Sequence, residues 1–348
     1  MTEKKTKVAI IGASGYTGSD LIRLASRHPN ISIEALTAGT HAGKSIDHVF
    51  PHLSGLQLPS LVRNEEVDWN AIEAVFCGLP HATSQSVIKD LPKHLKIIDM
   101  SADFRLRDKN LYESTYGTPH HATELQKEAV YGLTEHYREA IKKARLVACP
   151  GCYPTAALLL LLPLVTSGLI DPSDLIIDAK SGTTGAGRAP KQNTLYSETG
   201  EGMGPYAVAQ HRHAPEIEQE LSIAANAEIT VNFTPHLIPM SRGELVTCYA
   251  RLTKSHSAED CKKALQQQYI NDSFVDLSPE QVYPQTQFVR GSNRVMLNAY
   301  NDRINGRVIL IASLDNLVKG SAGQALQNFN LMTGYRETTG LEQIALFP

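Results

Sequence analysis

The segment Lys7-Val-Ala-Ile-Ile-Gly12-Ala-Ser-Gly15-Tyr-Thr-Gly18 indicates how the N-terminal half of this chain folds. An apolar run ends at the first glycine, and residues 17–28 then carry leucine and isoleucine at helical spacing. A second apolar run, residues 31–36, follows directly. This order of strand, glycine-rich loop, helix and strand predicts a βαβ unit with two parallel strands.

The same pattern continues up to about residue 150. Apolar runs followed by Gly, Ser or Asp recur at residues 74–78, 95–99 and 145–149. Strands that alternate with helices form parallel sheets. We therefore predict a Rossmann-like, doubly wound α/β domain with a parallel sheet over residues 1–150.

The pattern changes after Pro150. Residues 155–165 predict a very apolar helix, and residues 228–233 and 244–251 alternate polar and apolar as strands with one solvated face do. Residues 293–313 predict a hairpin that turns at Asn305-Gly306. We expect an α+β catalytic and oligomerisation domain with a largely antiparallel sheet over residues 151–317. Residues 319–332 return to helix, so the segment from about 318 to 348 is expected to join the first domain.

Composition excludes several classes of protein. The chain has 348 residues with 33 Lys and Arg against 36 Asp and Glu, and this balance gives no reason to bind nucleic acid or an anionic membrane. Five scattered cysteines do not form a secreted disulfide scaffold. The first residues carry no signal-peptide pattern, and the longest apolar run is too short to span a bilayer. We expect a cytoplasmic protein with no nucleic-acid or membrane partner.

The glycines of the first loop predict a dinucleotide site. Backbone amides at a helix N-terminus bind a pyrophosphate, and glycines let the backbone approach it closely. The alternative is a tight turn that binds no ligand. The candidate contacts are the loop residues and one glycine after a later strand: Gly12, Ser14, Gly15, Tyr16, Thr17, Gly18 and Gly78.

The end of the second strand favours NADP over NAD. Sites that prefer NAD usually carry a carboxylate there to bind the ribose hydroxyl. Here the chain reads Leu36-Thr-Ala-Gly-Thr40, and Lys44 follows. The hydroxyl of Thr37 and the cation of Lys44 are therefore candidates to accept a 2′-phosphate.

Cys152 is the candidate nucleophile. In Cys149-Pro-Gly-Cys-Tyr-Pro154 the second proline suits the first turn of a helix, so Cys152 is expected at the helix N-terminus. Unpaired amides and the helix dipole favour a thiolate there, and a thiolate beside a dinucleotide suggests thioester chemistry. The alternatives are a buried structural cysteine and a C-x-x-C redox or zinc pair, although a second cysteine pair for zinc is absent.

His211 and His213 are the candidate proton-transfer residues, because a thiolate enzyme needs a group that exchanges protons near neutral pH. They precede a helix that is expected to begin at Pro215 and Glu216. The alternatives are a pair of metal ligands, for which no further ligand stands at a suitable spacing, and a solvated loop without a role. We predict no metal site.

Two segments after predicted strands suit an anion. Arg105 follows the strand that ends at Asp99, and a glycine-rich stretch runs from Lys180 to Arg188. Arginine and backbone amides bind phosphate groups. Either segment could instead be a solvated loop.

Six blocks in order resemble the N-acetyl-γ-glutamyl-phosphate reductases, the arginine-pathway branch of the aspartate-semialdehyde dehydrogenase superfamily. The resemblance extends over the whole chain. It implies NADPH-dependent reduction of N-acetyl-L-glutamyl 5-phosphate to the 5-semialdehyde, with release of phosphate. The blocks are Gly12–Gly18, Ser101–Arg105, Pro150–Thr155, Lys180–Gly182, His211–Glu216 and Asp315–Gly320.

The resemblance also implies roles for individual residues. Cys152 would be the nucleophile and His211 the acid/base residue. The protein would bind a small acyl-phosphate substrate and would assemble as a homodimer or homotetramer. Ser181, Gly182 and Asn316 would contact the cofactor near its nicotinamide. The residues implied for the substrate pocket are Arg105, Ser181, Gly182, His213 and Glu216, and further candidates are Arg188, Tyr206 and Arg242.

The sequence departs from the family pattern at two places. Ala38 and Gly39 stand where relatives usually carry an arginine, and Cys149 stands where asparagine is most frequent. The second departure leads to the hypothesis of a regulatory disulfide between Cys149 and Cys152. Two other functions stay open, namely a sister dehydrogenase for another acyl phosphate and a cofactor-binding regulator without catalysis.

Overall fold

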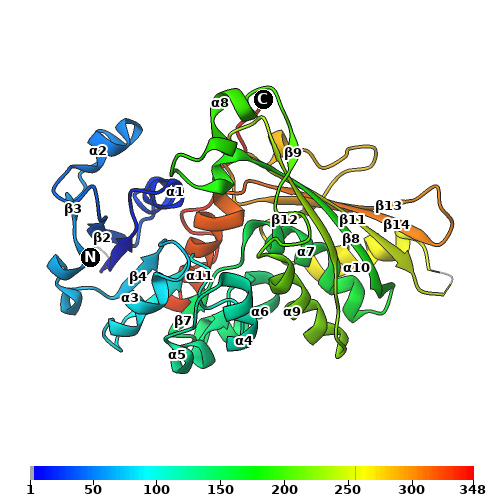
Figure 1. Ribbon diagram of the computed structural model, residues 1–348, viewed down its shortest axis with the longest axis horizontal. Coiled ribbons are helices and arrows are strands. Elements are labelled where there is room, and N and C mark those ends of the chain that lie inside the picture. The colour runs from blue at the N-terminus through cyan, green and yellow to red at the C-terminus, as the bar shows by residue number, and fades with distance from the viewer. Residues whose placement is uncertain (1–3, 255) are drawn as a thin grey trace. The chain divides into compact units, whose positions relative to one another are not determined.

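The computed structural model describes residues 4–254 and 256–348 (Figure 1). The chain forms two units. The first ends at Pro150 and takes in Ser321–Glu342, and the second comprises Gly151–Gly320 and Gln343–Pro348.

The first unit is built on a seven-stranded sheet in which all adjacent strands are parallel, as the alternation of strands and helices predicts. The strand order is β3-β2-β1-β4-β5-β7-β6, so the chain moves in opposite directions from β1. Doubly wound sheets bind ligands at such a point. The strands are β1 Thr6–Ile11, β2 Ile31–Thr37, β3 Leu61–Val62, β4 Ala74–Cys77, β5 Lys96–Asp99, β6 Val130–Tyr131 and β7 Leu146–Ala148.

Helices of the first unit come from both ends of its sequence. The helix expected over residues 319–332 is α11, and it packs against α1, α6 and β5. A short π-helical turn, Val318–Ala322, precedes it. The helices are α1 Tyr16–Ala25, α2 Ile46–Val49, α3 Ser84–Asp90, α4 Lys109–Tyr116, α5 Thr123–Glu128, α6 Thr134–Lys143 and α11 Gly323–Thr333.

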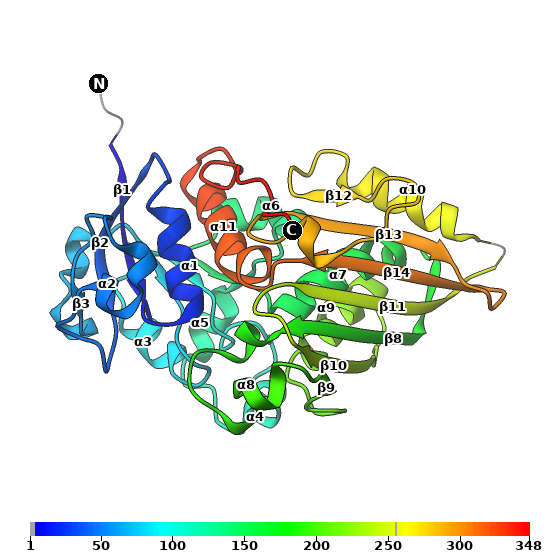
Figure 2. The same cartoon turned by 90° about the horizontal axis from the view of Figure 1, so that it is seen from above.

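The second unit is built on a mixed, largely antiparallel sheet with the order β12-β13-β14-β11-β8-β10-β9 (Figure 2). The four central pairings from β13 to β10 include three antiparallel ones and one parallel one, between β8 and β10. The strands are β8 Ile170–Gly182, β9 Gly204–Pro205, β10 Asn232–Ile238, β11 Glu244–Leu252, β12 Val275–Leu277, β13 Val295–Asn301 and β14 Arg307–Leu314.

Helix α7, Cys152–Thr166, lies in the core of the second unit. It is apolar on all sides, as a fully buried helix must be, and residues Tyr153 to Val165 are all buried. It packs on β8, β11 and β14 and is covered by α9 and α10. The other helices of this unit are α8 Tyr196–Thr199, α9 Ala214–Ala225 and α10 Ala258–Tyr269.

The strand predicted over residues 228–233 is misplaced. The structure has β10 over Asn232–Ile238, and this strand pairs in parallel with β8. Side chains of α9 account for the difference, because Ser222 Oγ accepts the amide of Ile229 and Glu218 Oε1 accepts the amide of Val231. Those two amides are therefore not available for strand pairing.

The predicted hairpin is confirmed. Strands β13 and β14 pair in antiparallel register, and Gly306 in the connection has a φ of +76°. A positive φ of this kind favours glycine.

Residues 343–348 belong to the second unit, whereas the sequence assigns them to the first. The amide of Leu346 donates a hydrogen bond to the carbonyl of Arg290, and the Leu346 side chain approaches Gly291. These contacts lie within the second unit. The residues that make them come several positions after the end of α11, so the helical pattern of the sequence does not predict them.

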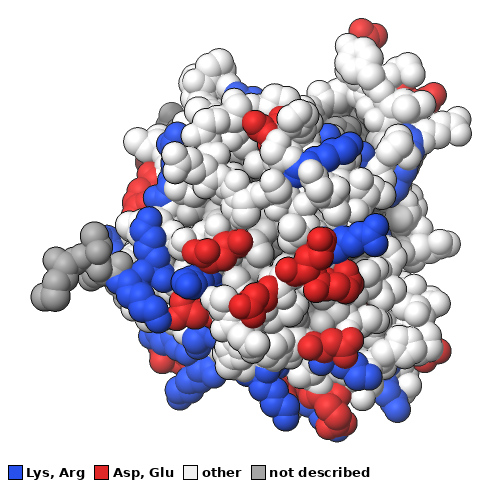
Figure 3. Space-filling model, turned by 90° about the vertical axis from the view of Figure 1, so that its left-hand side faces the viewer, with Lys and Arg blue, Asp and Glu red and all other residues white. Residues whose placement is uncertain are grey.

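Charges of both signs are mixed on the molecular surface. On the face drawn in Figure 3, lysine and arginine lie among aspartate and glutamate, in agreement with the formal net charge of −3. None of the helices in the described part of the chain has the length and apolar character that a bilayer crossing needs.

Candidate active site

The glycine-rich loop of the first unit has room only for glycine at two positions. Gly12 has a φ of +79°, and a Cβ added there would lie 2.5 Å from the carbonyl oxygen of Gly78. A Cβ on Gly18 would lie 2.7 Å from the carbonyl oxygen of Gly12. The loop therefore forms a tight turn between β1 and α1, with backbone close to backbone.

The loop leaves the amides at the start of α1 available. Helix α1 begins at Tyr16, its N-cap is Gly15, and no side chain caps it. The amides of Tyr16, Thr17 and Gly18 precede the first i to i−4 hydrogen bond, which Ser19 donates to Gly15. An arrangement of this kind fits a pyrophosphate.

The residues after β2 fit a nucleotide that carries a 2′-phosphate. Thr37 is buried at the end of the strand, Lys44 is exposed, and open space surrounds the Cα of Gly39. His41 is a further polar residue there, which the sequence reasoning missed, and its ring nitrogen Nδ1 is buried without a hydrogen-bond partner among the described residues. Residues 37–44 include no carboxylate that would repel the phosphate.

Arg105 lies at the carboxyl edge of the first sheet, where the sequence places it. Its Nε donates to the carbonyl of Cys149 at 2.8 Å, and its Nη2 donates to the carbonyl of Met100 at 3.1 Å. These carbonyls follow β7 and β5, two neighbouring strands. Its role in substrate binding stays a prediction.

Cys152 is the first residue of α7 in the second unit, and Pro154 lies in the first turn as expected. Its thiol forms no disulfide and is partly exposed. Glycine is required at position 320 beside it, because a Cβ on Gly320 would lie 2.7 Å from the Cβ of Cys152.

Cys149 forms no disulfide either. Burial raises the pKa of its thiol to about 12, so at neutral pH the thiol keeps its proton.

Strand directions bring several predicted residues to one end of the second sheet. Because β11 is antiparallel to both neighbours, Glu244 at its start lies opposite Ser181 on β8 and Leu314 on β14. Asn316 joins them, since its Oδ1 accepts the amide of Gly243 at 2.9 Å. The amide of Gly182 donates a hydrogen bond to the carbonyl of the same Gly243, also at 2.9 Å. The structure thus groups Ser181, Gly182 and Asn316, which the sequence assigns to cofactor and substrate.

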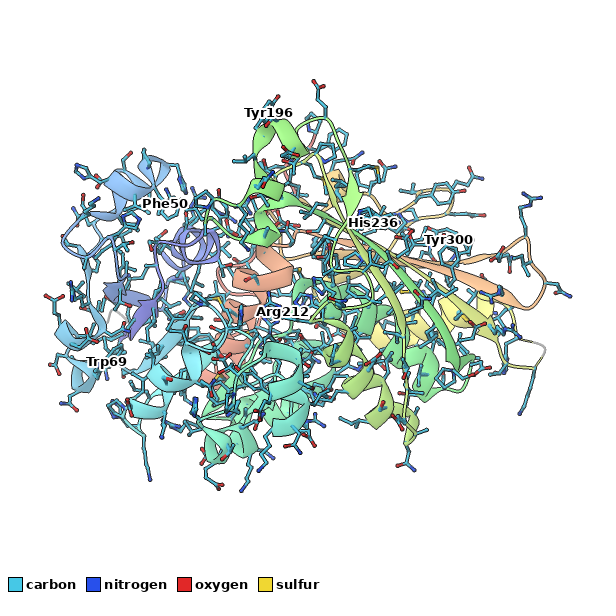
Figure 4. All side chains as sticks on the ribbon, in the orientation of Figure 1. Phe50, Trp69, Tyr196, Arg212, His236 and Tyr300 are labelled. Atoms are coloured by element: carbon cyan, nitrogen blue, oxygen red, sulfur yellow. The ribbon has the colours of Figure 1, made fainter. Side chains whose placement is uncertain are left out.

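The two histidines lie on the loop before α9 and share an aromatic cluster. Their ring centroids are 4.8 Å apart, and the amide of His213 donates to Nδ1 of His211 at 3.1 Å. Burial, together with the charge of Arg212 (Figure 4), lowers the pKa of His211 to about 4. His211 is therefore neutral at pH 7 and can accept a proton.

Two tyrosines complete this cluster. The ring of His211 lies 5.6 Å from that of Tyr153 and 5.3 Å from that of Tyr206. The Tyr206 hydroxyl donates to the Tyr153 hydroxyl at 3.1 Å, and burial raises the pKa of both phenols well above the usual value. The sequence does not indicate a role for Tyr153 in the site, because a tyrosine inside an apolar helix is expected to be a core residue.

His213 and Glu216 determine the backbone just before the nucleophile. The amide of Gly151 donates to Oε1 of Glu216 at 2.8 Å, and Glu216 is fully buried. A Cβ on Gly151 would lie 2.4 Å from Nε2 of His213, so only glycine leaves room for that ring. Substrate contacts of these two residues stay a prediction.

Metal ligation has no support in the described residues. Within residues 4–254 and 256–348, no three His, Cys, Asp or Glu side chains are grouped so that they could hold a metal ion.

Two family models match the chain. One, described as "Semialdehyde dehydrogenase, NAD binding domain", matches residues 7–144, and the other, described as "Semialdehyde dehydrogenase, dimerisation domain", matches residues 152–316. A protein of Rhodospirillum rubrum named N-acetyl-gamma-glutamyl-phosphate reductase is 54% identical over 99% of each chain. A probable chloroplastic N-acetyl-gamma-glutamyl-phosphate reductase of Arabidopsis thaliana is 53% identical over 99% of this chain and 86% of its own length.

Solved structures share the fold. Aspartate semialdehyde dehydrogenase II from Vibrio cholerae aligns with a TM-score of 0.74 and 17% identity over 95% of this chain and 99% of its own. Aspartate semialdehyde dehydrogenase with NADP from Candida albicans aligns with a TM-score of 0.68 at 17% identity over the same shares. The predicted fold class, a Rossmann-like unit followed by a unit with a largely antiparallel sheet, is confirmed.

Proposed function

The chain belongs to the N-acetyl-γ-glutamyl-phosphate reductase family, and we propose that it reduces N-acetyl-L-glutamyl 5-phosphate to the 5-semialdehyde with NADPH and releases phosphate. The observation that carries the proposal is the position of Cys152. It begins a helix at the sheet end that also holds Ser181 and Asn316, and His211 packs on the next residue of that helix.

The loop and the region after β2 would hold the cofactor. The loop from Gly12 to Gly18 suits the pyrophosphate, Gly78 closes the turn, and Thr37, His41 and Lys44 suit the 2′-phosphate. Ser181, Gly182 and Asn316 are our proposal for the nicotinamide end. When bound, NADPH supplies the hydride for the reduction.

Cys152 would attack the acyl phosphate. Its sulfur forms a bond to the acyl carbon, the bond from that carbon to the phosphate oxygen breaks, and phosphate leaves with the electron pair. Amides at the start of α7 stabilise both the thiolate and the oxygen anion of the tetrahedral intermediate. Arg105 and His213 are our candidates for substrate contacts, Arg105 for the leaving phosphate.

His211 would handle the proton on the substrate oxygen after the thioester is reduced. Reduction leaves a negative charge on the oxygen of the reduced carbon. His211 would protonate that oxygen and take the proton back as the aldehyde forms and the carbon–sulfur bond breaks. A neutral imidazole accepts that proton. Tyr153 and Tyr206 keep the ring in place from two sides.

We also propose a cytoplasmic homo-oligomer of two or four copies. The match of the second unit to a dimerisation-domain model supports assembly. None of the five cysteines forms a disulfide in the structure, which suits a reducing compartment.

Turnover in the reverse direction tests the substrate. Phosphate-dependent oxidation of N-acetyl-glutamate semialdehyde with NADP should proceed, and oxidation of aspartate semialdehyde should be slower by orders of magnitude. The opposite preference would favour a sister dehydrogenase. Cofactor binding without oxidation of either aldehyde would favour the regulator. Cys152→Ser should bind NADPH and lose turnover, and mass spectrometry should locate the acyl adduct of the wild type on Cys152.

A further inference from the structure

The loop between β4 and α3 lies next to the glycine-rich loop of the first unit. The amide of Gly78 donates a hydrogen bond to the carbonyl of Ile11 at 2.9 Å, and a Cβ on Gly12 would lie 2.5 Å from the carbonyl oxygen of Gly78. The strand order places β2 on one side of β1 and β4 on the other, which is where doubly wound sheets bind ligands. Residues 78–83 and 12–18 are therefore the two segments that we expect to flank a dinucleotide.

Ala82 in the β4–α3 loop has a strained backbone. Its φ is +67°, in the left-handed region that residues other than glycine rarely adopt. Such a conformation costs free energy and persists only where the surrounding structure holds it. Residues 78–83 are all at least partly exposed, so burial of Ala82 does not account for its conformation.

Asp103 supplies hydrogen bonds that hold this part of the loop. Its Oδ1 accepts the amide of Ala82 at 2.7 Å, and its Oδ2 accepts the hydroxyl of Ser84 at 2.9 Å and the amide of Gln85 at 3.0 Å. Asp103 is 0% exposed, and hydrogen bonds to a carboxylate are stronger away from water. The exposed loop is thus fixed by a buried carboxylate.

Asp103 is itself anchored by residues outside this loop. The hydroxyl of Tyr112 on α4 donates to Oδ1 of Asp103 at 2.7 Å, and Nε2 of His120 donates to the carbonyl of Asp103 at 2.8 Å. Tyr112 and His120 are both buried, and their ring centroids are 4.8 Å apart. The same segment after β5 also holds the beginning of the loop, because Ser101 Oγ accepts the amide of Leu79 at 3.1 Å.

We propose that Asp103 is a positioning residue for the dinucleotide, because it fixes the β4–α3 loop in the shape that binding requires. The proposal rests on the proposed function in one respect, the binding of NADPH at residues 12–18. A loop that is ordered beforehand loses less conformational entropy when a ligand binds, so its order raises affinity. A residue that only supports the fold would change the unfolding free energy, whereas a positioning residue also changes the affinity for NADPH.

Asp103→Asn tests the proposal. The variant keeps the size of the side chain and one acceptor oxygen, but its NH2 group replaces the other oxygen and faces hydrogen-bond donors. The dissociation constant of NADPH, measured by fluorescence titration, should rise roughly 10- to 10²-fold, the effect of losing one or two hydrogen bonds to a charged group. KM for NADPH should rise with it, while kcat at saturating NADPH and KM for the acyl phosphate should change little.

Hydrogen exchange provides a second measurement, in the protein without cofactor. The amides of Ala82 and Gln85 should exchange faster in Asp103→Asn than in the wild type, because they lose their acceptor. Unchanged exchange of both amides would contradict the proposed hold on the loop.

A matched control is Tyr112→Phe. It removes one hydrogen bond from the same carboxylate but leaves the amides of Ala82 and Gln85 their acceptor. This variant should have a lower unfolding free energy and the NADPH dissociation constant of the wild type. An equal loss of affinity in Tyr112→Phe and Asp103→Asn would reduce the role of Asp103 to general support of the unit and overturn the proposal.

Ala82→Val takes over the test if Asp103→Asn does not fold. The substitution removes no buried group, and a β-branched side chain makes the left-handed backbone still less favourable. NADPH binding should weaken, whereas Gln281→Val, at an exposed left-handed residue of the second unit, should leave it unchanged. Wild-type affinity in a folded Asp103→Asn, or in Ala82→Val, would overturn the role of Asp103 alone. A wild type that binds no NADPH would overturn the proposed function as well, and because the titration needs no substrate, the identity of the acyl phosphate does not affect the outcome.

Discussion

The amide of Gly151 donates a 2.8 Å hydrogen bond to Oε1 of Glu216, which ties the residue before the nucleophile to a buried carboxylate on α9. The sequence reasoning assigns Glu216 to the substrate. The structure shows it in a second role, as a group that orients the start of α7.

Glu216→Ala should destabilise the protein and slow the reaction. The buried amide of Gly151 would lose its acceptor, which costs about 1–3 kcal/mol of unfolding free energy. Urea denaturation and kcat measure the two effects. Glu216→Gln keeps an acceptor oxygen and should recover most of the stability, so equal losses in both variants would contradict this assignment.

His211→Asn should lower kcat by roughly 10²–10⁴-fold, the usual contribution of one acid/base group. The substitution leaves a polar side chain on the loop, so NADPH binding and unfolding should change little. Steady-state kinetics with the acyl phosphate provide the measurement. His256→Asn, at an exposed histidine of the same unit, should match the wild type. Wild-type turnover in His211→Asn would assign the proton transfer to another residue.

Gly12→Ala should prevent tight binding of NADPH and destabilise the first unit. The new Cβ would lie 2.5 Å from the Gly78 carbonyl on a backbone with positive φ, at a combined cost of roughly 2–5 kcal/mol. Thermal unfolding and cofactor fluorescence titration report the two losses. Gly204→Ala, where no atom lies within 4 Å of the new Cβ, is the control that should unfold like the wild type. Normal NADPH affinity in Gly12→Ala would rule out the loop as the pyrophosphate site.

Glu244→Gln should become increasingly more stable than the wild type as pH rises. The folded-state pKa of Glu244 is raised from 4.5 to about 8, so below pH 4.5 the carboxyl is protonated in both states and costs nothing. Between these values the unfolded state releases the proton and the folded state keeps it, so wild-type stability falls. The stability difference between the two proteins should grow by roughly 1.4 kcal/mol per pH unit over this range. Urea denaturation at several pH values measures the slope, and a flat difference would mean that Glu244 titrates normally.

The sequence allowed prediction of features that depend on local chain geometry. The glycines of the first loop, the helix start at Cys152 and the turn at Gly306 each depend on a few neighbouring residues. The positions of Glu244 and Gly320 depend instead on strand register and on the packing of α7, which connect residues far apart in the chain. From the sequence alone, Glu244 is expected to be the polar first residue of a strand that alternates polar and apolar side chains. The strand prediction for residues 228–231 was wrong for a similar reason, because side chains of α9 accept hydrogen bonds from the backbone amides of Ile229 and Val231.

Neither unit is formed by one continuous stretch of sequence, because the chain passes from one unit to the other after Pro150, after Gly320 and again after Glu342. Helix α11 supplies part of the first unit, so that unit cannot be completed on the ribosome until nearly the whole chain has been synthesised. A recombination event that exchanges the nucleotide-binding half between relatives would need two crossovers beyond the first. A chimera that replaces the first unit as a whole must therefore exchange two separate stretches of sequence.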